Sequence, residues 1–357
     1  MKSMTAIDAF CGAGGLTIGL LRVGFEILLG FDLDEKCIET ILKNPKTSQH
    51  VVLQSDVKNM LGGKLLKKAG LKKGALDLLA GGPPCQGFSV QRTIGGDRDV
   101  RNLLVDDYGD LINEIRPRFF LMENVPGIGG NRGREIVERF KEKMSSIGYF
   151  CHEKILDAQD FGVPQRRRRF LVVGEKITPP GPFFVWPPKK RPGAINSVRT
   201  AIGHLPPPPS NGKDHPDFFG HRSDRLSDKN KARLMAIKEG QARDDLPKHL
   251  LADCHKLSSD AIGHRNVYGR MAWDKVAPTI TARFDSFTRG KFGHPTQLRS
   301  ISLLEGALLQ TFPRNFKFAG TKVEIARQIG NAIPPNFAAA IGRALAKAIK
   351  KHKRDVI

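Results

Sequence analysis

The strongest constraint on this chain lies in residues 81–89, Gly-Gly-Pro-Pro-Cys-Gln-Gly-Phe-Ser, which follow a short apolar run at 76–80. The run has the length and the flanking breakers of a buried strand, so Cys85 falls in a loop just after the strand's carboxyl end. Open α/β sheets bind their ligands at that edge. The two prolines stiffen the approach to the thiol. Cys85 is therefore a candidate nucleophile, with a buried structural cysteine as the alternative.

The chain opens with a predicted strand at 5–10, a glycine turn at 11–15 (Cys-Gly-Ala-Gly-Gly) and an amphipathic helix at 16–23 that ends at Gly24. This order is typical of a nucleotide-binding βαβ unit. The dinucleotide fingerprint is not met, because Thr17 stands where its third glycine would fall, and no Gly-Lys-Ser/Thr of a phosphate-binding loop follows. The turn predicts a nucleotide-like ligand and disfavours a nicotinamide oxidoreductase.

Carboxylates follow the next two predicted strands. Asp32 comes after the strand at 26–31, and Asp56 after the strand at 51–53. A carboxylate at such a strand end commonly accepts hydrogen bonds from ribose hydroxyls. Each aspartate alone could instead cap a helix. Together, beside a glycine turn, they indicate a site for an adenosine-like group.

Glu123 follows a fifth predicted strand at 119–122, and four arginines, 166–169, lead into an apolar strand at 170–173. Glu123 is a candidate acid, although a helix cap or a salt-bridge partner is equally open. Strand residues alternate between faces, so we expect Arg167 and Arg169 to point to the same side. Their rigid donor forks suit phosphate or planar recognition, and a solvated edge strand is the alternative.

The formal net charge is +22, from 58 Lys and Arg against 36 Asp and Glu. Such an excess attracts polyanions and favours nucleic acid over a small-molecule substrate. Lys and Arg recur through 187–275. From 178 to about 273 the chain is rich in Pro, His, Lys and Arg, which predicts a separate, loop-rich module. The basic stretch at 347–354 could be only a solvated end.

The five cysteines are scattered, without the spacing of a disulfide framework or a metal site, so we expect neither. The cysteines are Cys11, Cys37, Cys85, Cys151 and Cys254.

No apolar run has the length of a membrane span, and no signal peptide is evident, so we expect a cytoplasmic protein without membrane contact.

With these residues in view, the chain resembles the DNA (cytosine-5) methyltransferases, the bacterial family that depends on S-adenosylmethionine. The family's motifs occur in the family's order over nearly the whole chain outside 187–275. They are 8–15 (Asp-Ala-Phe-Cys-Gly-Ala-Gly-Gly), Asp32, Asp56, 81–86 (Gly-Gly-Pro-Pro-Cys-Gln), 99–104, 123–125 (Glu-Asn-Val), 165–169 (Gln-Arg-Arg-Arg-Arg), 299–313 and 328–331 (Gln-Ile-Gly-Asn).

The resemblance implies an α/β fold: a Rossmann-like, S-adenosylmethionine-dependent methyltransferase domain with a mixed, mostly parallel sheet, plus a smaller, loop-rich target-recognition domain. We expect the catalytic and cofactor-binding domain at 1–186, completed by 318–357. The target-recognition domain is then 187–317, with its variable region at about 187–275.

The resemblance also implies roles for single residues. Cys85 would add to C6 of cytosine, Glu123 would hydrogen-bond N3 and the exocyclic amine, and Arg167 and Arg169 would hold the cytosine O2 and nearby phosphate. The cofactor, S-adenosylmethionine with S-adenosylhomocysteine as its product, would be lined by Phe10, Gly12, Ala13, Gly15, Asp32, Leu33, Asp56, Val57, Pro83, Leu104 and Asn331. No metal is implied.

The activity implied is sequence-specific methylation of double-stranded DNA on a flipped-out cytosine, by an enzyme that we expect to act as a monomer. A restriction endonuclease for the same site would be its possible partner. An RNA methyltransferase is one alternative, although the Cys-Phe-Thr tripeptide usual in that branch is absent. A non-catalytic DNA-binding protein on the same fold is another.

Overall fold

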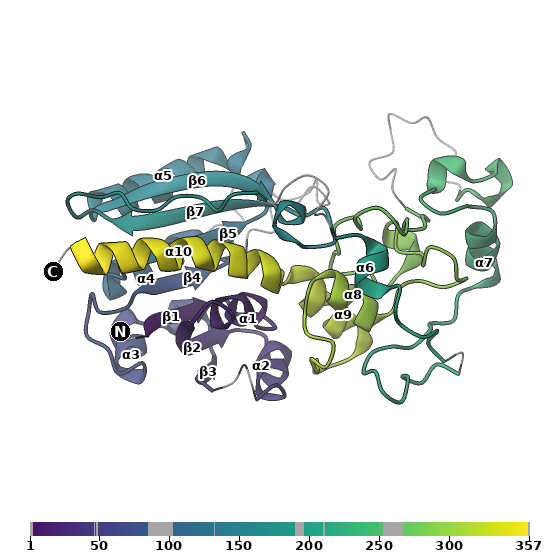
Figure 1. Ribbon diagram of the computed structural model, residues 1–357, viewed down its shortest axis with the longest axis horizontal. Helices are drawn as coiled ribbons and strands as arrows, with labels where there is room; N and C mark the ends of the chain where they lie inside the picture. The colour runs from purple at the N-terminus through teal and green to yellow at the C-terminus, as the bar shows by residue number, and fades with distance from the viewer. Residues whose placement is uncertain are drawn as a thin grey trace. The chain divides into compact units, whose positions relative to one another are not determined.

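The computed structural model describes residues 3–45, 47, 49–84, 103–131, 133–189, 196–209, 211–252 and 267–355. The chain divides into two compact units (Figure 1). The first contains Met1–Phe161, Arg168–Lys189 and Ile333–Ile357, and the second contains Gly162–Arg167 and Lys190–Ala332. The first unit thus resumes at Ile333, whereas the sequence placed the return at 318. The assignment of catalysis and target recognition to two domains stays a prediction.

The first unit is built on a seven-stranded sheet with the strand order β3-β2-β1-β4-β5-β7-β6. Strands β1 to β5 pair in parallel, and β7 lies antiparallel between β5 and β6. The predicted α/β fold with a mixed, mostly parallel sheet is confirmed. The strands are β1 (Met4–Ala9), β2 (Phe25–Asp32), β3 (Val51–Gln54), β4 (Leu78–Gly81), β5 (Phe119–Asn124), β6 (Tyr149–Asp157) and β7 (Arg168–Lys176).

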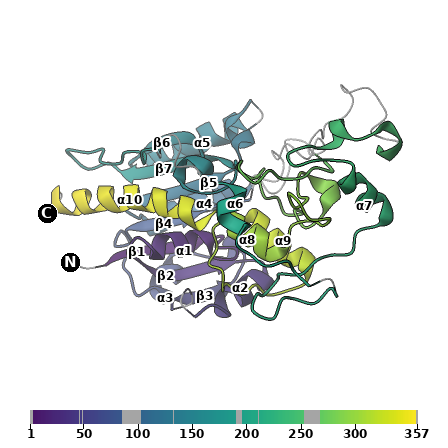
Figure 2. The ribbon, with the colours of Figure 1, turned by 45° about the vertical axis from the view of Figure 1, so that its right-hand side comes forward.

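Helices cover both faces of this sheet. Ile7 and Ala9 of β1 share a buried apolar cluster with α3, α4 and α5. Asp8, which points to the opposite face because strand residues alternate, contacts Thr17 of α1. Helix α10 packs beside α1 (Figures 1 and 2). The helices of this unit are α1 (Gly15–Leu21), α2 (Glu35–Leu42), α3 (Gly62–Lys68), α4 (Leu103–Ile115), α5 (Arg134–Ser146) and α10 (Pro335–Asp355).

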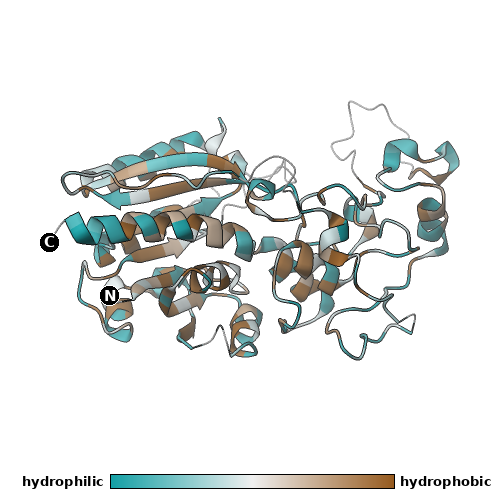
Figure 3. Ribbon diagram, viewed as in Figure 1, coloured by the Kyte–Doolittle hydropathy of each residue, from teal (hydrophilic) through white to brown (hydrophobic). Residues whose placement is uncertain are grey.

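The register of the parallel strands brings several loops to one edge. Ala9 pairs with Phe31 on one side and with Gly81 on the other, and Gly81 pairs with Met122. The residues that follow β1, β2, β4 and β5 therefore leave the sheet at its carboxyl edge, side by side. Hydrophobic residues occupy most of each inner strand (Figure 3). Polar side chains that could bind a ligand are therefore expected in the loops at the strand ends rather than within the strands.

The second unit has few regular elements among its described residues, as its composition predicted. Its helices are α6 (Val198–Ile202), α7 (Asp228–Met235), α8 (Leu303–Leu309) and α9 (Lys322–Asn331). Helix α8 begins with a capping box, in which Ser302 accepts from the amide of Glu305 and the Glu305 carboxylate accepts from the amide of Ser302. Such boxes satisfy amides that a helix start leaves without partners.

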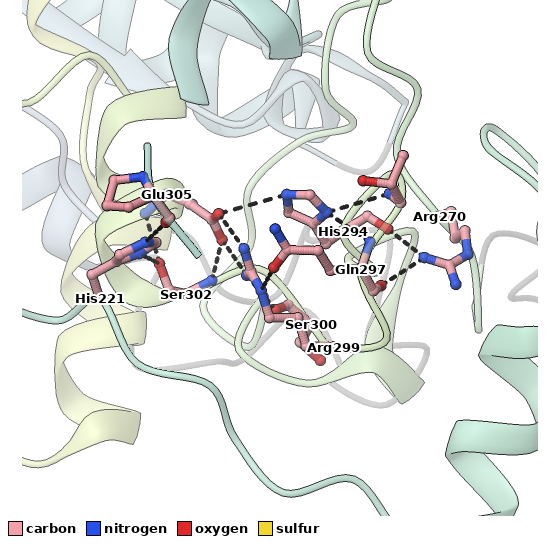
Figure 4. A network of polar contacts seen from close by, with 10 residues as sticks. His221, Arg270, His294, Gln297, Arg299, Ser300, Ser302 and Glu305 are labelled. Carbon is pink, nitrogen blue, oxygen red and sulfur yellow. Dashed lines mark hydrogen bonds and ion pairs between the residues drawn. The ribbon is translucent and has the colours of Figure 1, made fainter. Parts of the chain in front are cut away.

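Buried polar contacts take the place of a sheet in the second unit (Figure 4). Arg299 binds Glu305 with two hydrogen bonds of 2.7 Å, and both side chains are buried. Arg270 donates to the carbonyl oxygens of His294 and Gln297, each at 2.7 Å. Burial lowers the pKa of His294 to about 4, so this ring is neutral at pH 7. These contacts fix the loops of the unit in one arrangement.

Most predicted elements are present. The first five strands agree with the sequence to within two residues at either end. Asp34 caps α2, since its side chain accepts from the amide of Lys36 at 3.0 Å. Strand β6 and helices α3, α6, α7 and α9 were not predicted. Strand β7 lies inside the sheet, so the edge-strand alternative for the arginines is excluded. Among the described residues, no helix combines the length and apolar character needed to span a membrane.

Candidate active site

The loop that leads to Cys85 passes directly over the end of β5. The side-chain amide of Asn124 donates to the carbonyl oxygen of Pro83 at 3.0 Å, and Asn124 is buried. A Cβ atom on Gly82 would lie 3.1 Å from Oε2 of Glu123. Glycine at 82 thus lets the backbone approach that carboxylate closely. The described part of the loop ends at Pro84, and Cys85 lies outside the described residues.

Glu123 forms an ion pair with Arg169. Nε of Arg169 lies 2.6 Å from Oε1 of Glu123, and each side chain is 12% exposed. The two residues belong to the adjacent, antiparallel strands β5 and β7. Of the alternatives that the sequence left open for Glu123, the salt-bridge partner is the one observed. The ion pair occupies Oε1 and leaves Oε2 directed toward the cysteine loop at Gly82.

Arg167 lies elsewhere. Strand β7 begins at Arg168, so Arg167 precedes the strand and the expected common orientation with Arg169 does not apply. Its side chain is buried in the second unit, where it donates to the carbonyl oxygens of Ile280, Gly330 and Ala332. This burial does not support the implied contact of Arg167 with cytosine or phosphate.

Asp32 and the glycine turn form one structure. The Asp32 carboxylate accepts from the amides of Gly12 at 2.8 Å and Asp34 at 2.9 Å. Burial raises the pKa of Asp32, against the hydrogen bonds from these two amides, which lower it. The turn requires left-handed backbone at Gly12 (φ 51°) and Gly14 (φ 81°), and a Cβ atom on Gly12 would meet nothing within 4 Å. The turn is therefore open on the Gly12 side.

The remaining predicted cofactor residues of the first unit lie at the same edge or in elements that pack beneath it. Asp56 follows β3 and accepts from the amide of Lys58 at 3.0 Å, which is the capping contact that the sequence left open. Val57 is buried, while Leu33 is 65% exposed, an unusual value for a large apolar side chain. The others in this unit are Phe10, Ala13, Gly15, Pro83 and Leu104.

These residues fit an adenosyl group. Such sites in α/β sheets provide an open glycine turn, carboxylates at strand ends and an apolar surface. Here the carboxylates are Asp32, the last residue of β2, and Asp56, which follows β3, and the apolar side chain is the exposed Leu33. Asn331 is the last residue of α9, in the second unit, and is exposed.

Two residues at this edge were given no role from the sequence. Asn124 holds the cysteine loop through Pro83, as described above. Asp8 is 1% exposed, and its Oδ2 accepts from the hydroxyl of Thr17 at 2.6 Å. Burial raises the pKa of Asp8 to about 7. The signal for Asp8 was a single carboxylate inside the apolar stretch 5–10, directly before the glycine turn.

Known proteins match nearly the whole chain. The family model described as C-5 cytosine-specific DNA methylase matches residues 4–347. The Type II methylase M.HgiDII of Herpetosiphon aurantiacus is 38% identical over 350 residues, which cover 97% of this chain and 94% of the relative. The Type II methyltransferase M1.HphI of Haemophilus parahaemolyticus is 34% identical over 355 residues, with 97% and 87% covered.

Solved structures agree in fold. A crystal structure of a prophage-encoded DNA modification methyltransferase from E. coli matches with a TM-score of 0.69 and 26% identity, covering 98% of this chain and all of that one. The S. pombe Dnmt2 methyltransferase matches with a TM-score of 0.64 at 15% identity, over 96% of this chain and 98% of that one, and supports the fold alone. This chain therefore belongs to the C-5 cytosine-specific DNA methylases, the enzymes that methylate cytosine in DNA at C5.

Proposed function

We propose that this enzyme methylates cytosine within a specific sequence of double-stranded DNA, with Cys85 as nucleophile and S-adenosylmethionine as methyl donor. The observation that carries the proposal is the meeting of three parts at one sheet edge: the cysteine loop at Gly82 and Pro83, the Glu123–Arg169 ion pair, and the open glycine turn held by Asp32.

The chemistry on the base follows from these side chains. The Cys85 thiolate forms a bond to C6 of the cytosine, and the displaced electron pair makes C5 nucleophilic. Glu123, carrying a proton, would donate a hydrogen bond to N3 and accept one from the exocyclic amine, and so stabilise the negative charge that builds on the ring. After C5 has been methylated, a base removes the C5 proton, and the electron pair of that C–H bond restores the C5–C6 double bond as the thiolate leaves.

Arg169 orients this carboxylate. Because the ion pair uses Oε1 of Glu123, the direction of Oε2 is fixed toward the loop that carries Cys85. Nη1 of Arg169 donates to the carbonyl oxygen of Arg168 at 2.8 Å, and Nη2 suits a planar acceptor such as the cytosine O2. The Arg169 side chain would then hold both Glu123 and the target cytosine.

The chain's own residues would bind S-adenosylmethionine, which supplies an electrophilic methyl group on a sulfonium ion. Asp32 would accept from the ribose hydroxyls, Asp56 would bind the adenine amine, and the exposed Leu33 would cover the adenine face. The open side of Gly12 would admit the methionine part. Asn331, the last residue of α9, is proposed as a further cofactor-binding residue.

The substrate is proposed to be duplex DNA. The charge of +22 suits a polyanion, and a target atom inside a duplex requires the cytosine to be flipped out, at a cost of a few kcal/mol. Residues 187–275 would read the sequence, since base contacts specify and phosphate contacts position. The relatives are named Type II methyltransferases, so we propose a restriction-modification role in the cytoplasm of a prokaryotic cell, with an endonuclease of the same specificity as partner.

The test is transfer of tritium from labelled S-adenosylmethionine to duplex DNA. We expect transfer by the wild type and by Cys151→Ala, which removes another thiol on β6, and none by Cys85→Ala. Transfer RNA offered in competition with DNA should stay unlabelled. Equal transfer by Cys85→Ala and wild type would contradict the proposed nucleophile, and preferential labelling of RNA would contradict the proposed substrate.

A further inference from the structure

Arg167 is enclosed by backbone carbonyl groups of the second unit. Its side chain is 1% exposed. Nη1 donates to the carbonyl oxygen of Ile280 at 3.0 Å, and Nη2 donates to those of Gly330 and Ala332, each at 2.9 Å. Gly330 and Ala332 flank Asn331, so one nitrogen of Arg167 binds the carbonyl oxygens of the residues before and after Asn331.

Two of these bonds, to Gly330 and Ala332, fall at the end of helix α9, where a helix leaves its carbonyl groups without partners. Helix α9 ends at Asn331, and the last carbonyl groups of a helix find no N–H donor within that helix. Hydrogen bonds from a charged donor are stronger than neutral ones, and burial shields them from competing water. Arg167 therefore fixes the peptide group that joins Gly330 to Asn331 and the one that follows Ala332, and so holds the short backbone segment that carries the Asn331 side chain.

Neighbouring contacts restrict the same segment further. Gln165 accepts from the amide of Ile280 at 2.9 Å and donates to the side chain of Gln310 at 2.7 Å, and Gln310 donates in turn to the carbonyl oxygen of Ile329. A Cβ atom on Gly330 would lie 2.2 Å from the carbonyl carbon of Thr281. The backbone at 329–332 thus has one tightly defined path.

We infer that Arg167 is a positioning residue for cofactor binding, acting through Asn331 rather than through the target base. The inference rests on the proposed role of Asn331 in binding S-adenosylmethionine. It also gives the arginine segment two separate tasks: Arg169 sets the carboxylate of Glu123, and Arg167 sets the asparagine of the cofactor site.

The experiment is a double-mutant cycle on the full-length protein, with dissociation constants for S-adenosylhomocysteine measured by calorimetry in the absence of DNA. The variants are Arg167→Lys, Asn331→Ala and the double variant. Lysine keeps the buried charge but cannot reproduce the fork of donors. Residues that act as one unit give non-additive effects in such a cycle.

The matched control is Arg270→Lys. Arg270 is also a buried arginine of the second unit that donates to backbone carbonyls. Its partners are the carbonyl oxygens of His294 and Gln297 (Figure 4) and those of Leu234 and Ile237. None of these residues flanks Asn331. A merely structural role would make the two lysine variants alike, both in thermal unfolding and in ligand binding.

We expect Arg167→Lys to raise the dissociation constant about tenfold, comparable to the loss of one charged hydrogen bond. Asn331→Ala should raise it similarly, the double variant little further, and Arg270→Lys not at all. Additive effects, an unchanged constant in Arg167→Lys, or an equal rise in Arg270→Lys would overturn the inference. An unchanged constant in Asn331→Ala would also overturn it, while Cys85-dependent methyl transfer would still stand.

Discussion

Glu123 owes its orientation to its two neighbours. Arg169 occupies one carboxylate oxygen at 2.6 Å, and the backbone at Gly82 lies against the other. An ion pair between side chains that are only 12% exposed is screened little by solvent, so this geometry persists at physiological salt. The Glu123 carboxyl group is thus oriented before the target cytosine binds. Such preorganisation is what stabilises charge that develops on the ring during the reaction.

Replacing Glu123 by Gln should lower the rate of methyl transfer by about 10²- to 10⁴-fold, the usual contribution of a positioned acid or base. The amide retains the size of the side chain but loses the ion pair with Arg169. Single-turnover methylation of a short duplex measures the rate, and Glu153→Gln on β6 is the control for loss of an ion-paired glutamate. A wild-type rate in Glu123→Gln would exclude its proposed role.

Asp8 should make the stability of the protein depend on pH. Burial raises its pKa from 3.8 to about 7, so between these values the native state holds a proton that the unfolded chain has lost. The stability contributed by this proton is fully present below pH 3.8 and is lost as pH rises through about 7. Above that pH the folded protein must bury a charge, near Asp32 and Cys11.

Asp8→Asn should remove this dependence, because the amide oxygen can still accept from Thr17 without carrying a charge. The free energy of unfolding of Asp8→Asn minus that of the wild type should therefore increase with pH between pH 5 and pH 8. Below pH 7 the increase should be about 1 kcal/mol per pH unit. Urea unfolding at several pH values measures it. A difference that is constant over this range would show that Asp8 is ionised in the folded protein.

At the scale of elements, α10 is held to the sheet by a buried carboxylate. Asp77, just before β4, accepts from the amide of Thr5 at 2.9 Å and pairs with Arg118 at 2.9 Å and Lys353 at 2.7 Å. The Asp77 side chain is 2% exposed and that of Lys353 is 31% exposed. The basic end of the chain is therefore only partly a solvated end.

Lys353→Met should destabilise the first unit by about 1 kcal/mol, more than an exposed pair would cost because it leaves a buried charge with fewer partners. Lys350→Met, one turn earlier on the same helix, alters an exposed lysine and is the control. Thermal unfolding by calorimetry compares them. Equal midpoints for the two variants would mean that Asp77 does not anchor the helix.

The elements found from the sequence were those whose side chains follow one simple pattern. Strands β1, β2, β4 and β5 are apolar runs between breakers, because they are buried on both faces. Strand β6 is exposed or half-buried over most of its length and carries His152, Glu153 and Lys154, so it lacked that signal. Helix α3 starts with two glycines and is rich in lysine, and only Leu65 and Leu66 mark its buried side.

At the scale of the whole molecule, the candidate site was predictable where it depends on strand ends. Parallel strands bring their carboxyl ends to one edge, so Asp32, Glu123 and the cysteine loop were expected together. The partners of Arg167 were not predictable, because Ile280, Gly330 and Ala332 lie 113 to 165 residues further along the chain. Contacts of such separation leave no local pattern in the sequence.

The central claim is that a thiolate at position 85 bonds to cytosine C6 while Glu123 stabilises the ring. Duplex DNA containing 5-fluorocytosine at the target site tests it most directly, because fluorine cannot leave as the C5 proton does and the bond to sulfur persists. With S-adenosylmethionine present, we predict a denaturant-resistant protein–DNA adduct that peptide mapping locates at Cys85. Absence of this adduct on DNA that the enzyme methylates, or its formation by Cys85→Ala, would contradict the account.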